Sequence, residues 1–165
     1  MSNFLEVERF ARRLRLLTVA TATALVAATL FAVAMPGIAF VALETDGLPH
    51  FAASAIAVVA VALAAGGLAE LSLMFQAVEH GQAFAPTSTR RFRRFALLIL
   101  LSAIAKIVLP PLAQFGLAAY AGRGKISVAI DDSSLLTLLI GALLFFIARL
   151  FDEAARLEED SRSIV

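Results

Sequence analysis

Cysteine is absent from this chain of 165 residues, and charged residues are scarce. Without a thiol, the protein cannot form a disulfide, use cysteine as a nucleophile or bind a metal through sulfur. Charged residues make up 16% of the sequence, whereas a soluble domain carries about 25%. The formal net charge is only +1, which argues against a general polyanion-binding domain, because such a domain would be clearly basic.

Apolar residues, in contrast, are abundant. They make up 61% of the sequence, and the mean hydropathy is +0.89. A soluble chain of this length could build one core, but it could not bury so much apolar surface. Composition therefore places the protein in a lipid bilayer.

Four long apolar segments predict membrane-spanning helices, because each exceeds the roughly 20 residues needed to cross about 30 Å of hydrocarbon. These segments cover about 14–43, 51–78, 92–121 and 135–157. Pro86–Ser88, and Asp132 or Ser133, stand where caps of the third and fourth helices are expected. Short loops favour antiparallel neighbours, so we expect an all-α, integral membrane four-helix up-and-down bundle, with residues 1–165 as a single transmembrane domain.

Residues 1–13 predict an interfacial helix that leads into the first span. Asn3 and Glu6 have the spacing of a capping box. A cleaved signal peptide is the alternative, since Ala32-Val33-Ala34 resembles a cleavage site. The apolar run continues to Leu43, which is too long for a signal peptide, so a retained membrane helix is favoured.

Basic residues gather at one set of helix ends. They are Arg9, Arg12, Arg13 and Arg15 before the first span, Arg90, Arg91, Arg93 and Arg94 before the third, and Arg149, Arg156 and Arg162 near the end of the fourth. The positive-inside rule therefore predicts a multi-pass protein with both termini in the cytoplasm. The cluster at 90–94 is interpreted as a topological anchor that also meets anionic lipid headgroups. Direct binding of nucleic acid is disfavoured, because no aromatic stacking platform accompanies the cluster.

Three ionisable residues fall within the predicted spans: Glu70, Lys106 and Arg149. A bare charge there costs several kcal/mol, by order of magnitude. We expect Glu70 and Arg149 to pair across the bundle. Pro110-Pro111 should kink or break the third helix and free carbonyls near Lys106. Structural pairing is favoured over a proton or ion pathway, which would gather more polar groups.

Small residues recur four residues apart within the first two spans. They are Ala20, Ala24, Ala28 and Ala32, then Ala62 with Gly66, and Ala65 with Ala69. Small faces let helix backbones approach closely in lipid. These ladders predict packing seams, either within one chain or between chains.

Signatures of catalysis are nearly absent. His50 and His80 are predicted on opposite sides of the membrane, so they cannot share a metal. No zinc-protease, Walker, nucleophile-elbow or dinucleotide motif occurs. We therefore expect no enzyme activity, no metal and no cofactor.

The acidic C-terminal tail, 152–165, is the predicted site of any partner contact. Its acidic residues include Glu158, Glu159 and Asp160, and Val165 offers a terminal carboxylate. A plain solvated helix end is the alternative interpretation.

Two stretches resemble a known family. Met74–Ala96, with its Gly81-x-x-Phe84 element and basic helix start, and Leu139–Val165, with its acidic end, resemble the family catalogued as domain of unknown function 2975 (DUF2975). The resemblance implies a small four-helix protein of the bacterial inner (plasma) membrane, and nothing in the resemblance points to a catalytic activity. Members are often encoded beside a small helix-turn-helix regulator, which suggests a cytoplasmic transcriptional partner.

Two classes of function follow. The first is a non-enzymatic membrane adaptor or sensor that binds a cytoplasmic regulator through the loop Gly81–Arg94 and the tail. The second is a small transporter or channel component that uses Glu70, Lys106 and Arg149. A homo-oligomer or a structural subunit of a larger membrane complex is a further alternative.

Overall fold

The computed structural model describes residues 2–35, 48–79, 86–121 and 132–162, and these form four α-helices without a strand among them. The helices are α1 (Ser2–Ala34), α2 (His50–Glu79), α3 (Pro86–Ala121) and α4 (Asp132–Arg162). The predicted all-α fold with four helices is therefore confirmed. Among the predicted boundaries, Pro86 and Asp132 begin α3 and α4, as their cap chemistry suggested.

The first helix differs from its predicted extent at both ends. It starts at Ser2, so the segment expected at the interface and the first span form one continuous helix. It ends at Ala34, although the apolar run reaches Leu43. Pro36 explains this end, because proline disfavours helical geometry in the residue before it and has no amide hydrogen to donate. Residues 36–47 lie outside the described part of the chain.

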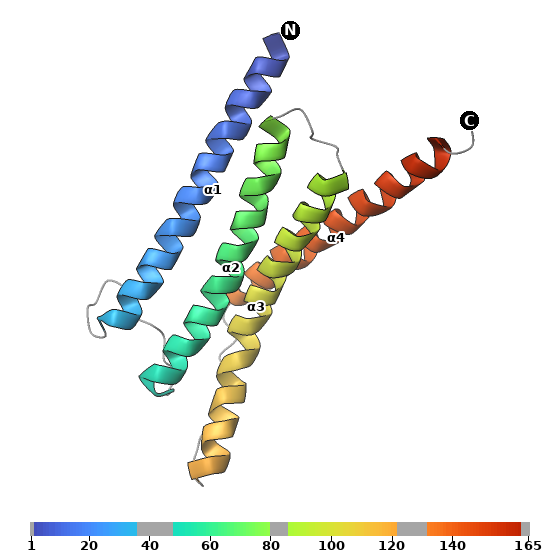
Figure 1. The fold of residues 1–165 in the computed structure, drawn as a ribbon. Coiled ribbons are helices and arrows are strands. Elements are labelled where there is room, and N and C mark those ends of the chain that lie inside the picture. The colour runs from blue at the N-terminus through green and yellow to red at the C-terminus, as the bar shows by residue number, and fades with distance from the viewer. Residues whose placement is uncertain (1, 36–47, 80–85, 122–131, 163–165) are drawn as a thin grey trace.

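Consecutive helices run antiparallel, so the up-and-down arrangement is observed (Figure 1). The start of α1, the end of α2, the start of α3 and the end of α4 lie toward the same end of the molecule (Figure 1). Helix α1 packs on α2, α2 on α3, and α3 on α4. No packing between α1 and α4 occurs in the described ranges, so the helices form an open arrangement rather than a closed ring.

Small residues at intervals of seven form the helix–helix seams. The most buried of them are Ala11, Thr18 and Ala32 on α1, Ala53, Ala60 and Gly67 on α2, Ala96 and Ala103 on α3, and Gly141 and Ala148 on α4. Helices that cross at a shallow angle repeat their contacts every seven residues. Side chains this small let the backbones approach closely.

The ladder predicted on the first helix is not a seam within the chain. Ala20, Ala24 and Ala28 are exposed, and only Ala32 is buried. Four residues turn a helix by about 400°, so each step of such a ladder moves about 40° around the axis. A step of seven moves only about 20°, which keeps a stripe against one neighbour.

Lipid contact follows from length and composition. In the described parts of the chain, three helices are long and apolar enough to cross a membrane: Phe10–Ala34, His50–Val78 and Thr87–Ala119. The apolar part of α4, Leu135–Phe151, is shorter than these, so within the described residues three of the four predicted spans have the length and composition of a membrane-spanning helix. Large apolar side chains such as Leu16, Phe115 and Leu139 are more than half exposed, which suits a surface that faces lipid.

Candidate functional site

The first turns of α3 are tied to α2 by two arginines, and we call residues 90–95 the basic end of α3. The Arg91 Nη1 group donates a 2.7 Å hydrogen bond to the carbonyl oxygen of Leu73. The Arg94 Nη1 group lies 3.6 Å from the Glu70 Oε1 atom. Arg91 and Arg94 are one helical turn apart on α3, and Glu70 and Leu73 are one turn apart on α2. Antiparallel packing therefore brings these two turns side by side.

These two contacts differ in strength. The hydrogen bond of Arg91 is short and has a charged donor, which roughly doubles the energy of a neutral bond. The side chain of Arg94 is 72% exposed and that of Glu70 is 23% exposed. At 3.6 Å their contact is an ion pair rather than a well-formed hydrogen bond. Arg91 therefore adds a charged hydrogen bond between α3 and α2, and Arg94 forms a partly screened ion pair with Glu70.

Aromatic rings tie the same turn of α3 to α4. The ring centroid of Phe92 lies 6.0 Å from that of Phe95 and 6.2 Å from that of Phe151, which it meets nearly edge-on. Such pairs contribute about 0.5–1.5 kcal/mol beyond the burial of area. Phe151 ends the apolar part of α4, so this contact holds α4 where its charged continuation, Asp152–Arg162, begins. That end of α4 extends away from the other helices (Figure 1).

Glu70 therefore pairs with Arg94, not with Arg149 as the sequence suggested. Arg149 is exposed on α4, and α4 packs on α3 rather than on α2. The prediction was based on the similar depths of Glu70 and Arg149 along their helices. It was wrong because depth does not reveal which helices are neighbours.

Lys106 is exposed on α3 and makes no hydrogen bond or ion pair with any residue that the structure describes. The helix continues through Pro110 and Pro111, so the two prolines do not break it. They nevertheless lack amide hydrogens, which leaves the carbonyls of Lys106 and Ile107 without their usual donors four residues later.

The remaining predicted site residues are placed as follows. Arg90 and Arg93 are exposed on the basic end of α3. Gly81, Phe84 and Val165 lie outside the described residues. Glu158, Glu159 and Asp160 belong to α4, but their side chains are not among those described. Within the described ranges, no three histidine, aspartate or glutamate residues come together as a metal site.

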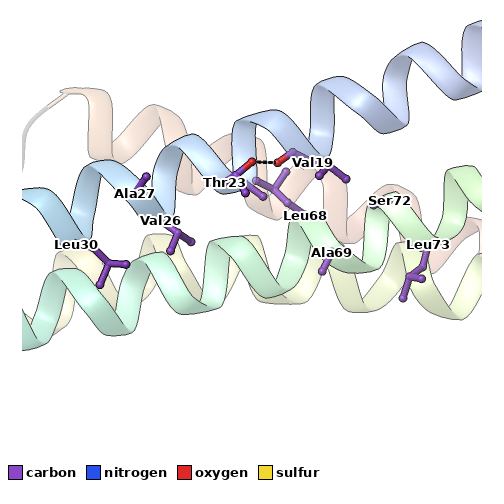
Figure 2. A pocket seen from close by; sticks show the side chains of 10 residues that line it. Val19, Thr23, Val26, Ala27, Leu30, Leu68, Ala69, Ser72 and Leu73 are labelled. Atoms are coloured by element: carbon purple, nitrogen blue, oxygen red, sulfur yellow. Dashed lines mark hydrogen bonds between the residues drawn. The ribbon is translucent and has the colours of Figure 1, made fainter.

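A groove between α1 and α2 is a feature that the sequence did not indicate (Figure 2). Its volume is about 650 Å³, and apolar side chains such as Leu30 and Leu68 line most of it. The Thr23 hydroxyl faces it but donates to the Val19 carbonyl of its own helix (Figure 2). Ser72 supplies the other hydroxyl in the lining. The groove suits an apolar chain better than it suits catalysis.

The aromatic contact of Phe92 with Phe151 was also missed. The two residues lie in different predicted helices, and nothing local in either sequence marks the other as a neighbour. Only the observed packing of α4 on α3 brings them together.

Comparison with known proteins gives no match to any family, curated protein or solved structure. The resemblance to DUF2975 therefore stays a prediction.

Proposed function

We propose that the protein is a non-enzymatic, multi-pass protein of the bacterial inner membrane that serves as an adaptor or sensor for a soluble cytoplasmic regulator. One observation carries this proposal. The α4 helix continues past its apolar part as a charged helix that begins next to the basic end of α3 and extends away from the other helices, toward the same end of the molecule as the start of α1 (Figure 1).

Charge supports the proposal. Arg90 on α3 and Glu153 on α4 are exposed at this end. Both signs of charge are thus available to a soluble partner close to the membrane surface. The resemblance to DUF2975 supports the nature of the partner, a helix-turn-helix transcriptional regulator. Lipid headgroups are the other contact that exposed arginines there would make.

Site-specific cross-linking in the native host tests the proposal. A photoreactive amino acid replaces Arg90 or Glu153 in separate variants, and Ala119 at the far end of α3 is the matched control position. We expect a soluble DNA-binding protein to be cross-linked from positions 90 and 153 but not from 119. Removal of residues 158–165 should abolish this product while membrane insertion is retained. Cross-links to membrane proteins alone, or the same product from position 119, would contradict the adaptor function.

A further inference from the structure

Lys106 lies near the middle of the membrane-spanning part of α3. It follows Arg94 by twelve residues, or about 18 Å of helix rise. Half of a hydrocarbon core of about 30 Å is about 15 Å, so an ammonium at this depth is far from the surface marked by the arginines. A charge there costs several kcal/mol, by order of magnitude, unless it meets a partner or water.

The chain itself offers Lys106 no partner in the described residues. It makes no hydrogen bond or ion pair with any of them. Glu70 is the only acidic residue within the apolar parts of the four helices. Glu70 is held by Arg94, and it therefore lies at the level of Arg94, far from that of Lys106.

Backbone acceptors add to the polarity at this depth. Pro110 and Pro111 remain inside α3, so the carbonyls of Lys106 and Ile107 lack their usual amide donors four residues later. Unpaired carbonyls are costly in lipid, and neighbouring polar groups normally satisfy them. One turn of α3 thus presents a positive donor beside two carbonyls that lack their usual helical donors.

The position of Lys106 on α3 leaves it accessible from the membrane. It follows Ser102 and Ala103 by one turn. Ser102 faces α2, where its hydroxyl bonds to the Ala60 carbonyl. Ala103 is buried one turn after Leu100, whose backbone meets Gly141 of α4. Lys106 therefore lies in the angle between α2 and α4, which do not pack on each other in the described ranges.

We propose that Lys106 is a docking site for a membrane-spanning helix of another protein that carries a carboxylate at mid-membrane. Charge complementarity selects this occupant, because a carboxylate neutralises the ammonium at the depth where both are most costly. The site is distinct from the cytoplasmic contacts of the adaptor function, so either can fail without the other.

A second copy of this chain does not supply the carboxylate. Copies related by a rotation axis normal to the membrane keep each residue at its own depth. Lys106 of one copy would then lie at the same depth as Lys106 of the other copy. Glu70 of either copy would stay about 18 Å away along the helix axis. A water-filled path is also disfavoured. The half-buried residues Ile99, Leu109 and Ala113, one or two turns from Lys106, are apolar, and the buried polar side chains of Ser102 and Gln114 already have partners within the protein.

A model helix tests the proposal without knowledge of the natural partner. The purified chain receives a single cysteine in place of Arg90 and is labelled with an acceptor dye, which the absence of other cysteines makes specific. The probe is a synthetic single-span leucine–alanine helix with a central glutamate and a donor dye. Energy transfer in phosphatidylcholine vesicles measures its association with the full chain. The matched probe carries glutamine instead of glutamate.

We expect the glutamine probe to bind about tenfold more weakly, the size of one or two interhelical hydrogen bonds in a membrane. Lys106→Met should cause a similar loss with the glutamate probe, and Lys106→Arg should retain binding. Moving the glutamate two turns along the probe helix should also weaken binding of the probe. Since the change from glutamate to glutamine leaves the protein untouched, impaired folding of Lys106→Met does not affect that comparison.

Three results would overturn the proposal. The first is equal binding of the glutamate and glutamine probes. The second is self-association of labelled copies that is lost in Lys106→Met, which would make a second copy the occupant. The third is rapid modification of a cysteine at position 106 by a membrane-impermeant maleimide, at the rate found at position 119, which would show a water-filled path.

Discussion

The hydroxyl of Ser102 on α3 donates a 2.8 Å hydrogen bond to the backbone carbonyl of Ala60 on α2. Both residues are buried, and Ala60 is only 1% exposed. A serine at this position serves two purposes: it is small enough for close approach of the backbones, and it adds a polar bond that lipid cannot replace.

Ser102→Ala should therefore lower the free energy of unfolding by about 0.6–1 kcal/mol, the usual size of an interhelical hydrogen bond in a membrane. The alanine keeps the close approach and removes only the bond. Titration with sodium dodecyl sulfate, followed by circular dichroism, measures the loss. An unchanged midpoint would show that the bond contributes nothing to stability.

Gly141 should be intolerant of any side chain. A Cβ atom added there would lie 3.2 Å from the Cα atom of Leu100, and backbone cannot move aside easily. Gly141→Ala should destabilise the protein by about 1–3 kcal/mol, the usual cost of overpacking. Gly116 is the matched control, since a Cβ atom there meets nothing within 4 Å. Gly116→Ala should be neutral or stabilising by up to about 1 kcal/mol. Equal effects of the two changes in thermal denaturation would contradict the close packing of α4 on α3.

The buried seam on α3 should be distinguishable from the exposed ladder on α1. Ala103 is 3% exposed, whereas Ala24 is exposed. Ala103→Leu should cost about 1–3 kcal/mol, because the leucine has no space between the helices. Ala24→Leu should leave the stability of the monomer unchanged. A loss of self-association in Ala24→Leu, measured by energy transfer between labelled copies, would instead mark the ladder as a contact between chains.

The sequence predicted the helices well and their contacts poorly. Apolar runs and caps located four helices, and three of these are long and apolar enough to cross a membrane. Length and hydrophobicity are local properties of a span, so the sequence alone reveals them. Residues such as Ala60 and Ala103 were not singled out, since alanine is so frequent that many ladders can be drawn. A spacing of seven is the signal that would have selected the right face, because it follows the shallow crossing of neighbouring helices.

The charged residues also show that the sequence can identify a residue that needs a partner without identifying the partner. The sequence identified Glu70 as an unusual charge that needs a partner, and the structure provides Arg94. Depth alone made Arg149 an equally good candidate. The choice depends on helix neighbours, and the order of packing from α1 to α4 is a property of the whole fold.

A double-mutant cycle should confirm the ion pair of Glu70 with Arg94. The side chain of Arg94 is 72% exposed, so solvent or headgroups screen the pair and its coupling energy should be about 0.2–1 kcal/mol. Glu70→Gln with Arg149→Gln should be additive in unfolding experiments. A larger coupling to Arg149 than to Arg94 would contradict the observed pairing.

Orientation in the membrane is the last prediction. Arginines gather at the end of the molecule where α1 and α3 begin, and Arg12, Arg90 and Arg94 are exposed there. Translocation of such clusters is unfavourable, so this end should stay in the cytoplasm. The natural absence of cysteine lets one engineered residue report on one site. A membrane-impermeant maleimide should label Ala119→Cys, at the far end of α3, in intact cells, and label Arg90→Cys only after the membrane is permeabilised. Labelling of position 90 in intact cells would reverse the topology, and it would place the proposed cytoplasmic contacts of α3 and α4 on the wrong side.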